Sequence, residues 1–215
     1  MKKVNKVTVL VDNDSWILPF AEKLCKELDQ RGIKAVFACE QQAIVEGDIC
    51  FMLGCTRIVS SENLAKNTHN LVVHESDLPQ GKGFAPMTWQ ILEGKHQIPI
   101  CVIEATAEVD AGPIWIKGEI SLEGWELCAD WRAAQGDKTV SLCIDCIDLF
   151  EDISPKPQHG TESFYARRSS TDSELDPNKT IVEQFDLLRV VDNERYPAFF
   201  THRGRKYRLK IYHDE

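Results

Sequence analysis

His74 and Asp110 are the two residues of this 215-residue chain whose types and positions are best suited to chemistry. His74 ends an apolar run, Leu71–Val73, and Asp110 follows a second apolar run, Ile98–Ala105, just before a Gly-Pro turn. If both runs are strands and parallel neighbours, their side chains meet at one edge of the sheet. Such a pair can exchange a proton near neutral pH, because an imidazole has an ordinary pKa of about 6.5. A structural histidine and a turn-forming aspartate are the alternatives.

Strand and helix signals alternate along the first half of the chain and would position such a pair. Short β-rich runs occur at Lys6–Val11, Lys34–Ala38 and Asp48–Leu53, and apolar residues at helical spacing lie between the first two. This alternation predicts an α/β fold, a Rossmann-like and mainly parallel twisted sheet with helices on both faces. Residues 12–15 (Asp-Asn-Asp-Ser) are predicted to cap the first helix. No glycine-rich phosphate loop follows the first strand.

The pattern changes after Pro113. Residues 114–122 alternate like an extended hairpin arm, and two helices are predicted at about 123–134 and 139–150. A polar loop then runs from 154 to 177, followed by a helix at 179–190 and a terminal hairpin around Arg203-Gly204. We therefore expect a body of residues 1–153 and a small C-terminal extension, residues 154–215, packed on it.

Composition excludes some functions. The net charge of −9 argues against a general nucleic-acid binder, although the region from Lys156 onward is near neutral with 11 Lys/Arg and 10 Asp/Glu. No apolar run reaches the ~18 residues that span a bilayer, and the start lacks a signal-peptide core, so we expect a cytoplasmic protein. The eight cysteines are expected to be reduced. Cys143 and Cys146 are interpreted as core thiols on one helix face rather than as metal ligands.

The segment HESDLPQGKGFAP, which begins at His74, is followed by WQILEG, IPICVIEA and EVDAGPI. Together these motifs resemble the folate-dependent formyltransferases, a family that includes the methionyl-tRNA formyltransferases. The resemblance is specific from about Leu71 to Ile120 and weaker over Lys6–Leu53. It implies a formyltransferase catalytic domain over residues 1–153, catalytic roles for His74 and Asp110, 10-formyltetrahydrofolate as the co-substrate, and no metal.

The resemblance also implies where the folate binds. The expected cofactor-binding residues are Leu53, Gly54, Cys55, Ser76, Leu78, Pro79, Gly81, Gly83, Phe84, Glu104 and Val109. One position departs from the family pattern, since the asparagine two residues before the histidine is Val72 here. Asn70 lies ~13 Å from residue 74 along an extended strand and cannot replace it. We expect Gln90 or a backbone N–H to hold the formyl oxygen in place of the missing asparagine.

The C-terminal region resembles that of short sugar N-formyltransferases. This implies an acceptor amine on a nucleotide-linked 4-amino-4,6-dideoxy sugar, with a UDP-sugar favoured, in surface glycan biosynthesis. The expected substrate-binding residues are Arg167, Arg168, Arg189, Asn193, Arg195 and Tyr196, with solvated charges and helix caps as the alternatives for some of them. A glycinamide ribonucleotide-type transformylase, a carrier-protein tailoring formyltransferase, an inactive folate-binding relative and a formyl hydrolase are the alternative functions. No nucleic-acid or membrane partner is expected, and a homodimer is a further expectation.

Overall fold

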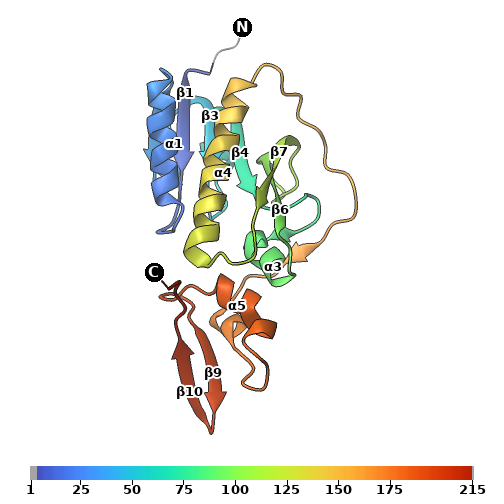
Figure 1. Cartoon of the computed structure of the whole chain (residues 1–215). Helices are drawn as coiled ribbons and strands as arrows, with labels where there is room; N and C mark the ends of the chain where they lie inside the picture. The colour runs from blue at the N-terminus through green and yellow to red at the C-terminus, as the bar shows by residue number, and fades with distance from the viewer. Residues whose placement is uncertain (1–3, 215) are drawn as a thin grey trace.

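The computed structural model describes residues 4–214, which form a sheet body with a C-terminal region beneath it (Figure 1). The strands of the body are β1 (Lys6–Leu10), β2 (Lys34–Ala38), β3 (Gly47–Met52), β4 (Asn67–His74), β6 (Gln97–Glu104) and β7 (Ile114–Ser121). Its helices are α1 (Leu18–Gln30), α2 (Ser61–Leu64), α3 (Pro86–Leu92) and α4 (Cys128–Asp148), with a short 3-10 helix at Gln41–Ala43. The mainly parallel α/β sheet with flanking helices that the sequence predicts is confirmed.

The strand order is β2-β1-β3-β4-β6-β7, and only the first four strands are parallel. β6 runs antiparallel to β4, with His74 opposite Cys101 and Leu71 opposite Glu104, and β7 runs antiparallel to β6. The predicted parallel pairing of the strands that precede His74 and Asp110 is therefore wrong. β6 ends beside the middle of β4, so the following loop must turn back before Asp110 can reach His74.

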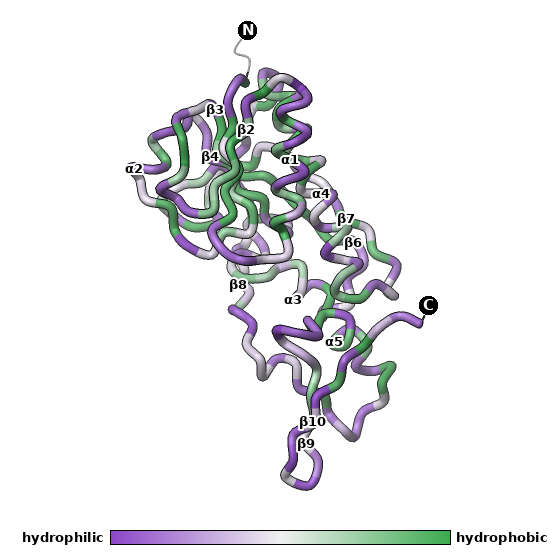
Figure 2. Tube along the Cα trace, turned by 90° about the vertical axis from the view of Figure 1, so that its left-hand side faces the viewer, coloured by the Kyte–Doolittle hydropathy of each residue, from purple (hydrophilic) through white to green (hydrophobic). Residues whose placement is uncertain are grey.

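Alternating side chains of the strands build two apolar layers. In β3, Ile49 and Phe51 enter the large core beneath α1 and α4, whereas Cys50 and Met52 join a smaller cluster that includes Leu64 of α2. Figure 2 shows the apolar strands between α2 on one side and α1 with α4 on the other. The two-residue period of a strand thus supplies both faces of the sheet.

α4 corrects the prediction of two separate helices, because it continues through Gly136. A Cβ atom at Gly136 would lie 2.5 Å from ring carbons of Phe20, so this glycine permits the close approach of α1 and α4 rather than ending a helix. The predicted cap of α1 is also wrong. Ile17 occupies the N-cap position without a side-chain hydrogen bond, and Asp12 instead accepts hydrogen bonds from the backbone of Thr56 and Arg57.

Cys143 and Cys146 are both fully buried in the large core, as predicted for core thiols. Burial raises the pKa of the Cys146 thiol to about 12 and that of the Cys143 thiol well above its ordinary value. Both thiols are therefore protonated at neutral pH and serve as small apolar side chains.

The C-terminal region begins as an extended segment along the flank of the sheet. Two-residue β5 (Lys82–Gly83) and β8 (Phe164–Tyr165) pair there, and α5 (Phe185–Val190) follows near α3. Two more 3-10 turns, Ser170–Ser173 and Val182–Gln184, lie between them. The predicted terminal hairpin is confirmed as β9 (Ala198–His202) and β10 (Arg205–Leu209), which project from the body in Figure 1. Over residues 4–214, no helix has the length and apolar character needed to cross a membrane.

Candidate active site

His74 is the last residue of β4, and its side chain is buried where the parallel strands end. Its Nε2 lies 2.9 Å from the carbonyl oxygen of Gly81, and its Nδ1 lies 3.8 Å from Oδ1 of Asp110. A carbonyl oxygen can only accept, so Nε2 carries a proton in this arrangement. Nδ1 is therefore the ring nitrogen that faces the carboxylate.

Asp110 reaches His74 from the loop between β6 and β7. Its backbone is left-handed, with φ 54°, and this turn brings the chain back toward the end of β4. Oδ2 of Asp110 accepts a hydrogen bond of 2.9 Å from the backbone N–H of Gly83. The structure thus brings the two predicted residues together, through a loop rather than through parallel strands.

The loop after β4 closes over the pair. Gly81 and Gly83 both have positive φ, and a Cβ atom at Gly83 would lie 2.5 Å from the carbonyl oxygen of Tyr165. Larger residues would therefore displace the loop at a position where it contacts Asp110. Beneath it, Ser76 is buried, and its Oγ has no hydrogen-bond partner among residues 4–214.

Glu75 is a third titratable group of this site, and the sequence interpretation missed it. Burial raises the pKa of the Glu75 carboxyl. Its electrostatic interaction with His74 and a hydrogen bond with Gln135 of α4 oppose this rise, and the charge of Asp110 adds to it. Its carbonyl oxygen accepts a hydrogen bond of 2.6 Å from Nε2 of Gln90. The Gln90 amide N–H groups are therefore already engaged, which does not support Gln90 as a substitute for the family asparagine. The sequence signal was a carboxylate directly after the histidine.

The predicted folate residues fall into three neighbouring segments. Leu53, Gly54 and Cys55 follow β3, the loop from Ser76 to Phe84 follows β4, and Val109 lies beside Asp110. Phe84 and Val109 are 46% and 60% exposed, which gives the site an apolar rim. Burial raises the pKa of the Cys55 thiol to about 12, so this residue is a neutral group at the end of β3.

Glu104 is the predicted folate residue that the structure does not support. Its carboxylate accepts hydrogen bonds from the backbone N–H of Asn70 (2.8 Å) and the indole N–H of Trp115 (3.0 Å), and it lies 3.1 Å from Nδ1 of His69. These contacts hold β4 and β7 against β6. The Glu104 carboxylate is therefore a structural group of the sheet.

The predicted acceptor residues divide into internal and accessible ones. The prediction for Arg189 is wrong, because this side chain is 0% exposed and its guanidinium donates to Glu126 and Asp186. The Asn193 side chain is also engaged within the protein, since its amide exchanges two hydrogen bonds with the backbone of Ile211.

Arg167, Arg168, Arg195 and Tyr196 remain available in part. Arg167 lies over the exposed ring of Phe84, and Tyr196 is 47% exposed. Arg168 is half-buried, with a buried Nε that has no partner within residues 4–214, and burial lowers the pKa of its guanidinium. Arg195 donates to the backbone carbonyl of Asp14.

A cavity of about 280 Å³ lies between the first turn of α4 and the C-terminal residues. Its lining includes Cys128 and Arg132 of α4, Asp192 and Asn193 after α5, and Tyr212. Seven residues, or ~10 Å at 1.5 Å per residue, separate Cys128 from Gln135, the α4 residue that bonds Glu75. The cavity and the Glu75 partner Gln135 thus lie on the same helix, about two turns apart.

The formyl transferase family model matches residues 20–124, a segment that contains both His74 and Asp110. Over these residues, which are just under half of the chain, the protein is similar to the formyltransferases. The resemblance inferred from the sequence is therefore confirmed. Within residues 4–214, no cluster of three or more His, Cys, Asp or Glu side chains could hold a metal ion.

Among curated relatives, the methionyl-tRNA formyltransferase of Sulfurihydrogenibium sp. (strain YO3AOP1) is 27% identical over 122 residues, which are 55% of this chain and 39% of that protein. The chain thus spans less than half the length of this relative. The match to it stops well short of a whole-protein correspondence.

Solved structures share the fold at low identity. Methionyl-tRNA formyltransferase from Clostridium thermocellum superposes with a TM-score of 0.80 at 19% identity, covering 99% of this chain and 94% of that one. A sugar N-formyltransferase from Shewanella sp FDAARGOS_354 gives 0.72 at 15% identity, with 98% of both chains covered. HypX from Aquifex aeolicus in complex with tetrahydrofolic acid gives 0.78 at 16%, covering 95% of this chain and 37% of HypX.

Proposed function

We propose that this protein is an N-formyltransferase that moves the formyl group of 10-formyltetrahydrofolate to the amine of a nucleotide-linked 4-amino-4,6-dideoxy sugar, with a UDP-sugar favoured. The observation that carries the proposal is the buried pair of His74 and Asp110, 3.8 Å apart at the end of the parallel strands. The family match supports formyl transfer, and the HypX complex supports a folate as the donor.

The residues around the pair suit a folate. Phe84 and Val109 supply apolar surface for a flat ring, and the unpartnered hydroxyl of Ser76 is a polar group still to be satisfied. Residues 53–55, 76–84 and 109 would hold the ring between them. When bound, the folate supplies a formyl carbon as the electrophile.

His74 and Asp110 divide the acid–base work. The 2.9 Å contact of Nε2 with the Gly81 carbonyl shows that an oxygen fits at donor distance from this nitrogen, so the formyl oxygen can take that place. Asp110 faces Nδ1 and stabilises the imidazolium, and its carboxylate accepts the proton that the attacking amine releases.

The acceptor is proposed from the C-terminal side of the site. The cavity at the start of α4 has apolar walls and polar groups that suit a ring such as a sugar or base. Arg168 interacts electrostatically with Cys128, which lines this cavity. The Nε of Arg168 is unpaired within the part of the chain that the structure describes, and its guanidinium can donate two parallel hydrogen bonds to a diphosphate. The likeness to a sugar N-formyltransferase over 98% of both chains supports a sugar acceptor.

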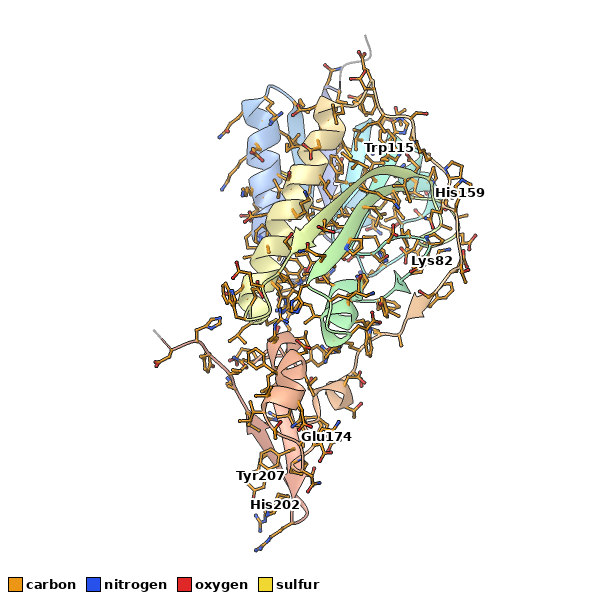
Figure 3. The ribbon with its side chains drawn as sticks, turned by 45° about the vertical axis from the view of Figure 1, so that its right-hand side comes forward. Lys82, Trp115, His159, Glu174, His202 and Tyr207 are labelled. Carbon is orange, nitrogen blue, oxygen red and sulfur yellow. The ribbon has the colours of Figure 1, made fainter. Side chains whose placement is uncertain are left out.

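The test is a transfer assay with 10-formyltetrahydrofolate and a panel of amino-sugar nucleotides. We expect tetrahydrofolate release and an acceptor mass increased by one CO. His74→Asn and Asp110→Asn should each lower the rate by about 100-fold or more, whereas His202→Asn on the exposed hairpin (Figure 3) should not.

Other outcomes identify the alternatives. Transfer to glycinamide ribonucleotide or to a carrier-protein aminoacyl group, and not to a sugar nucleotide, would replace the sugar acceptor. Formate release without an acceptor would indicate a hydrolase. Folate binding without any product would contradict the proposed activity and leave a binding protein.

A further inference from the structure

An extended segment outside the family-matched residues contacts both loops of the candidate site. We name residues 154–166 the strap. It runs along the flank of the sheet in Figure 1, and Figure 3 shows His159 of the strap and Lys82 of the loop after β4 on the same flank. The match to the family model ends at residue 124, so it assigns no role to the strap.

The strap first fastens the loop that carries Asp110. Lys156 and Ile114 exchange two backbone hydrogen bonds of 2.7 and 2.9 Å at the start of β7. Two residues later, the Gln158 side chain donates from Nε2 to the carbonyl oxygens of Asp110 (2.9 Å) and Gly112 (2.8 Å). One amide therefore spans the turn that returns Asp110 to His74.

The strap then fastens the loop that covers His74. The Ser163 hydroxyl accepts from the backbone N–H of Gly81 at 2.9 Å, and the Ser163 carbonyl accepts from that of Lys82 at 2.9 Å. The ammonium of Lys82, whose side chain is 2% exposed, lies 2.5 Å from Glu162. The Tyr165 carbonyl accepts from the N–H of Phe84. The Gly81 carbonyl and the Asp110 carboxylate both face His74, and they lie on two different loops. The strap is hydrogen-bonded to both loops.

Asp110 needs such support because its backbone is strained. The left-handed conformation, here at φ 54°, is unfavourable for a residue with a side chain relative to ordinary conformations. Gly112 cannot be replaced by a larger residue without a shift of the backbone, since a Cβ atom there would lie 1.7 Å from the Glu104 carbonyl oxygen. Hydrogen bonds from Gln158 to the carbonyls at both ends of this turn stabilise it directly.

The orientation of the Gln158 amide is set by its partners, because two carbonyl oxygens require the NH₂ group. This leaves Oε1 of Gln158 buried with no hydrogen-bond partner in residues 4–214. A buried acceptor without a partner destabilises the folded protein, because it has lost its hydrogen bonds to water. A polar group retained at such a cost favours a role in the site over a role in stability alone.

We propose that Gln158 is a positioning residue, which holds the left-handed turn of Asp110 so that the carboxylate faces Nδ1 of His74. The acid–base part of this inference rests on the proposed formyl transfer. The positioning part concerns geometry alone. Gln158 acts through Asp110 and touches neither reactant.

The test is a double-mutant cycle of Gln158→Leu and Asp110→Asn. Gln158→Leu keeps the size of the side chain and removes both donors, and we expect kcat to fall about tenfold, with KM for the folate changed less than twofold. In the Asp110→Asn background the same change should cost no further activity, because its effect passes through the carboxylate. Gln30→Leu, on the exposed end of α1, is the matched control and should leave kcat unchanged.

Conservative replacement and crystallography complete the test. Gln158→Asn shortens the donor and should restore part of kcat, whereas Gln158→Glu opposes a carboxylate to two carbonyl oxygens and should be at least as slow as the leucine variant. A crystal structure of Gln158→Leu should show Asp110 outside the left-handed region and farther than 3.8 Å from His74.

The outcomes separate the two proposals. An Asp110 that keeps its place in the crystal, or a loss of kcat of equal size in both backgrounds, would overturn the role of Gln158. A wild-type protein without transfer activity would instead overturn the proposed function, and the crystal structure would still decide whether Gln158 positions Asp110.

Discussion

The sheet body buries a continuous apolar cluster beneath α1 and α4, whereas the C-terminal region buries a small cluster around Leu175, Leu188, Val191 and Ala198. The C-terminal region contributes Val190 to the large cluster and is also tied to the body by polar contacts. Arg189 joins it to the end of β7 and the start of α4 through Glu126, and the strap joins it to the loops of the site. Apolar burial is cumulative and insensitive to direction, while a hydrogen bond depends on two particular atoms. Point changes should therefore act more selectively in the C-terminal region.

Arg189→Met should give the largest loss of stability among single changes in that region. The substitution leaves the Glu126 carboxylate, whose side chain is 9% exposed, without its buried cation. Breaking such a pair costs about 3–5 kcal/mol, because an uncompensated charge stays buried. Urea unfolding of the two proteins measures the difference.

Arg195→Met is the matched control for this change. Its ion pair with Asp14 is exposed on both sides and should contribute less than about 1 kcal/mol. Equal losses for the two variants would contradict the view that buried polar contacts attach the C-terminal region.

Leu24→Ala and Leu188→Ala compare the two cores directly. Leu24 is fully buried in the large core, and Leu188 is nearly so in the small one. Both changes remove the same atoms, but the small cluster can collapse around the space more easily. We expect about 4 kcal/mol for Leu24→Ala and about 2 kcal/mol for Leu188→Ala in urea unfolding. A larger loss at Leu188 would show that the C-terminal core is as rigid as that of the body.

Local patterns predicted the strands and the terminal hairpin because these depend on neighbouring residues. Lys34–Ala38 has the bounds that its apolar pattern indicates, and the Arg203-Gly204 turn lies between β9 and β10. The same is true of His74, whose place at a strand end follows from the residues around it.

The failed predictions concern partners that are distant in the chain. The antiparallel direction of β6 depends on the route of the preceding connection, and no residue of the strand encodes it. Two helices were predicted at about 123–134 and 139–150, but α4 continues through Gly136, whose contact with Phe20 is distant in the chain. Arg189 looked like a free cation, since Glu126 lies 63 residues earlier. Distant contacts of this kind also explain why Gln158 gave no signal.

Carboxylates that accept backbone hydrogen bonds occur in both regions and make stability depend on pH. Burial raises the pKa of Asp12, but hydrogen bonds from the neighbouring Asn13 amide and from Thr56 and Arg57 outweigh it, so the pKa is lowered overall. The pKa of Asp192 is likewise lowered, because hydrogen bonds from backbone N–H groups and from Arg132 outweigh its burial.

A lowered pKa in the folded state means that these groups stabilise the protein above the unfolded value of 3.8. That stability is lost as the pH falls through the lower folded-state pKa. Asp12→Asn and Asp192→Asn should each cost about 1–2 kcal/mol at pH 7, with the difference from wild type shrinking below pH ~4. Thermal unfolding across this range measures it. Asp14→Asn, an exposed control, should show neither the loss nor the pH dependence, and a constant difference at all pH values would contradict the linkage.

Charge changes on the hairpin should have the smallest effect. The segment 202–210 carries five Lys or Arg residues and no Asp or Glu, and every residue of β10 is exposed. Replacing Arg205 and Arg208 by glutamine removes two neighbouring like charges from this surface. We expect the unfolding free energy to change by less than about 0.5 kcal/mol, as for other exposed sites.

The same measurement at several protein concentrations tests the expected homodimer. β9 and β10 form a two-stranded sheet in which the other side of β9 is bridged at Phe199 to Glu174. No strand pairs with the other side of β10 within the part of the chain described here, and such an edge can pair with a second copy. If the hairpin is buried between two copies, wild-type stability will rise with protein concentration, and the Arg205→Gln/Arg208→Gln variant will change that dependence. If stability is independent of concentration in both proteins, the hairpin does not hold a dimer together. The C-terminal region would then be stabilised by its contacts with the body of the same chain, and not by a second copy.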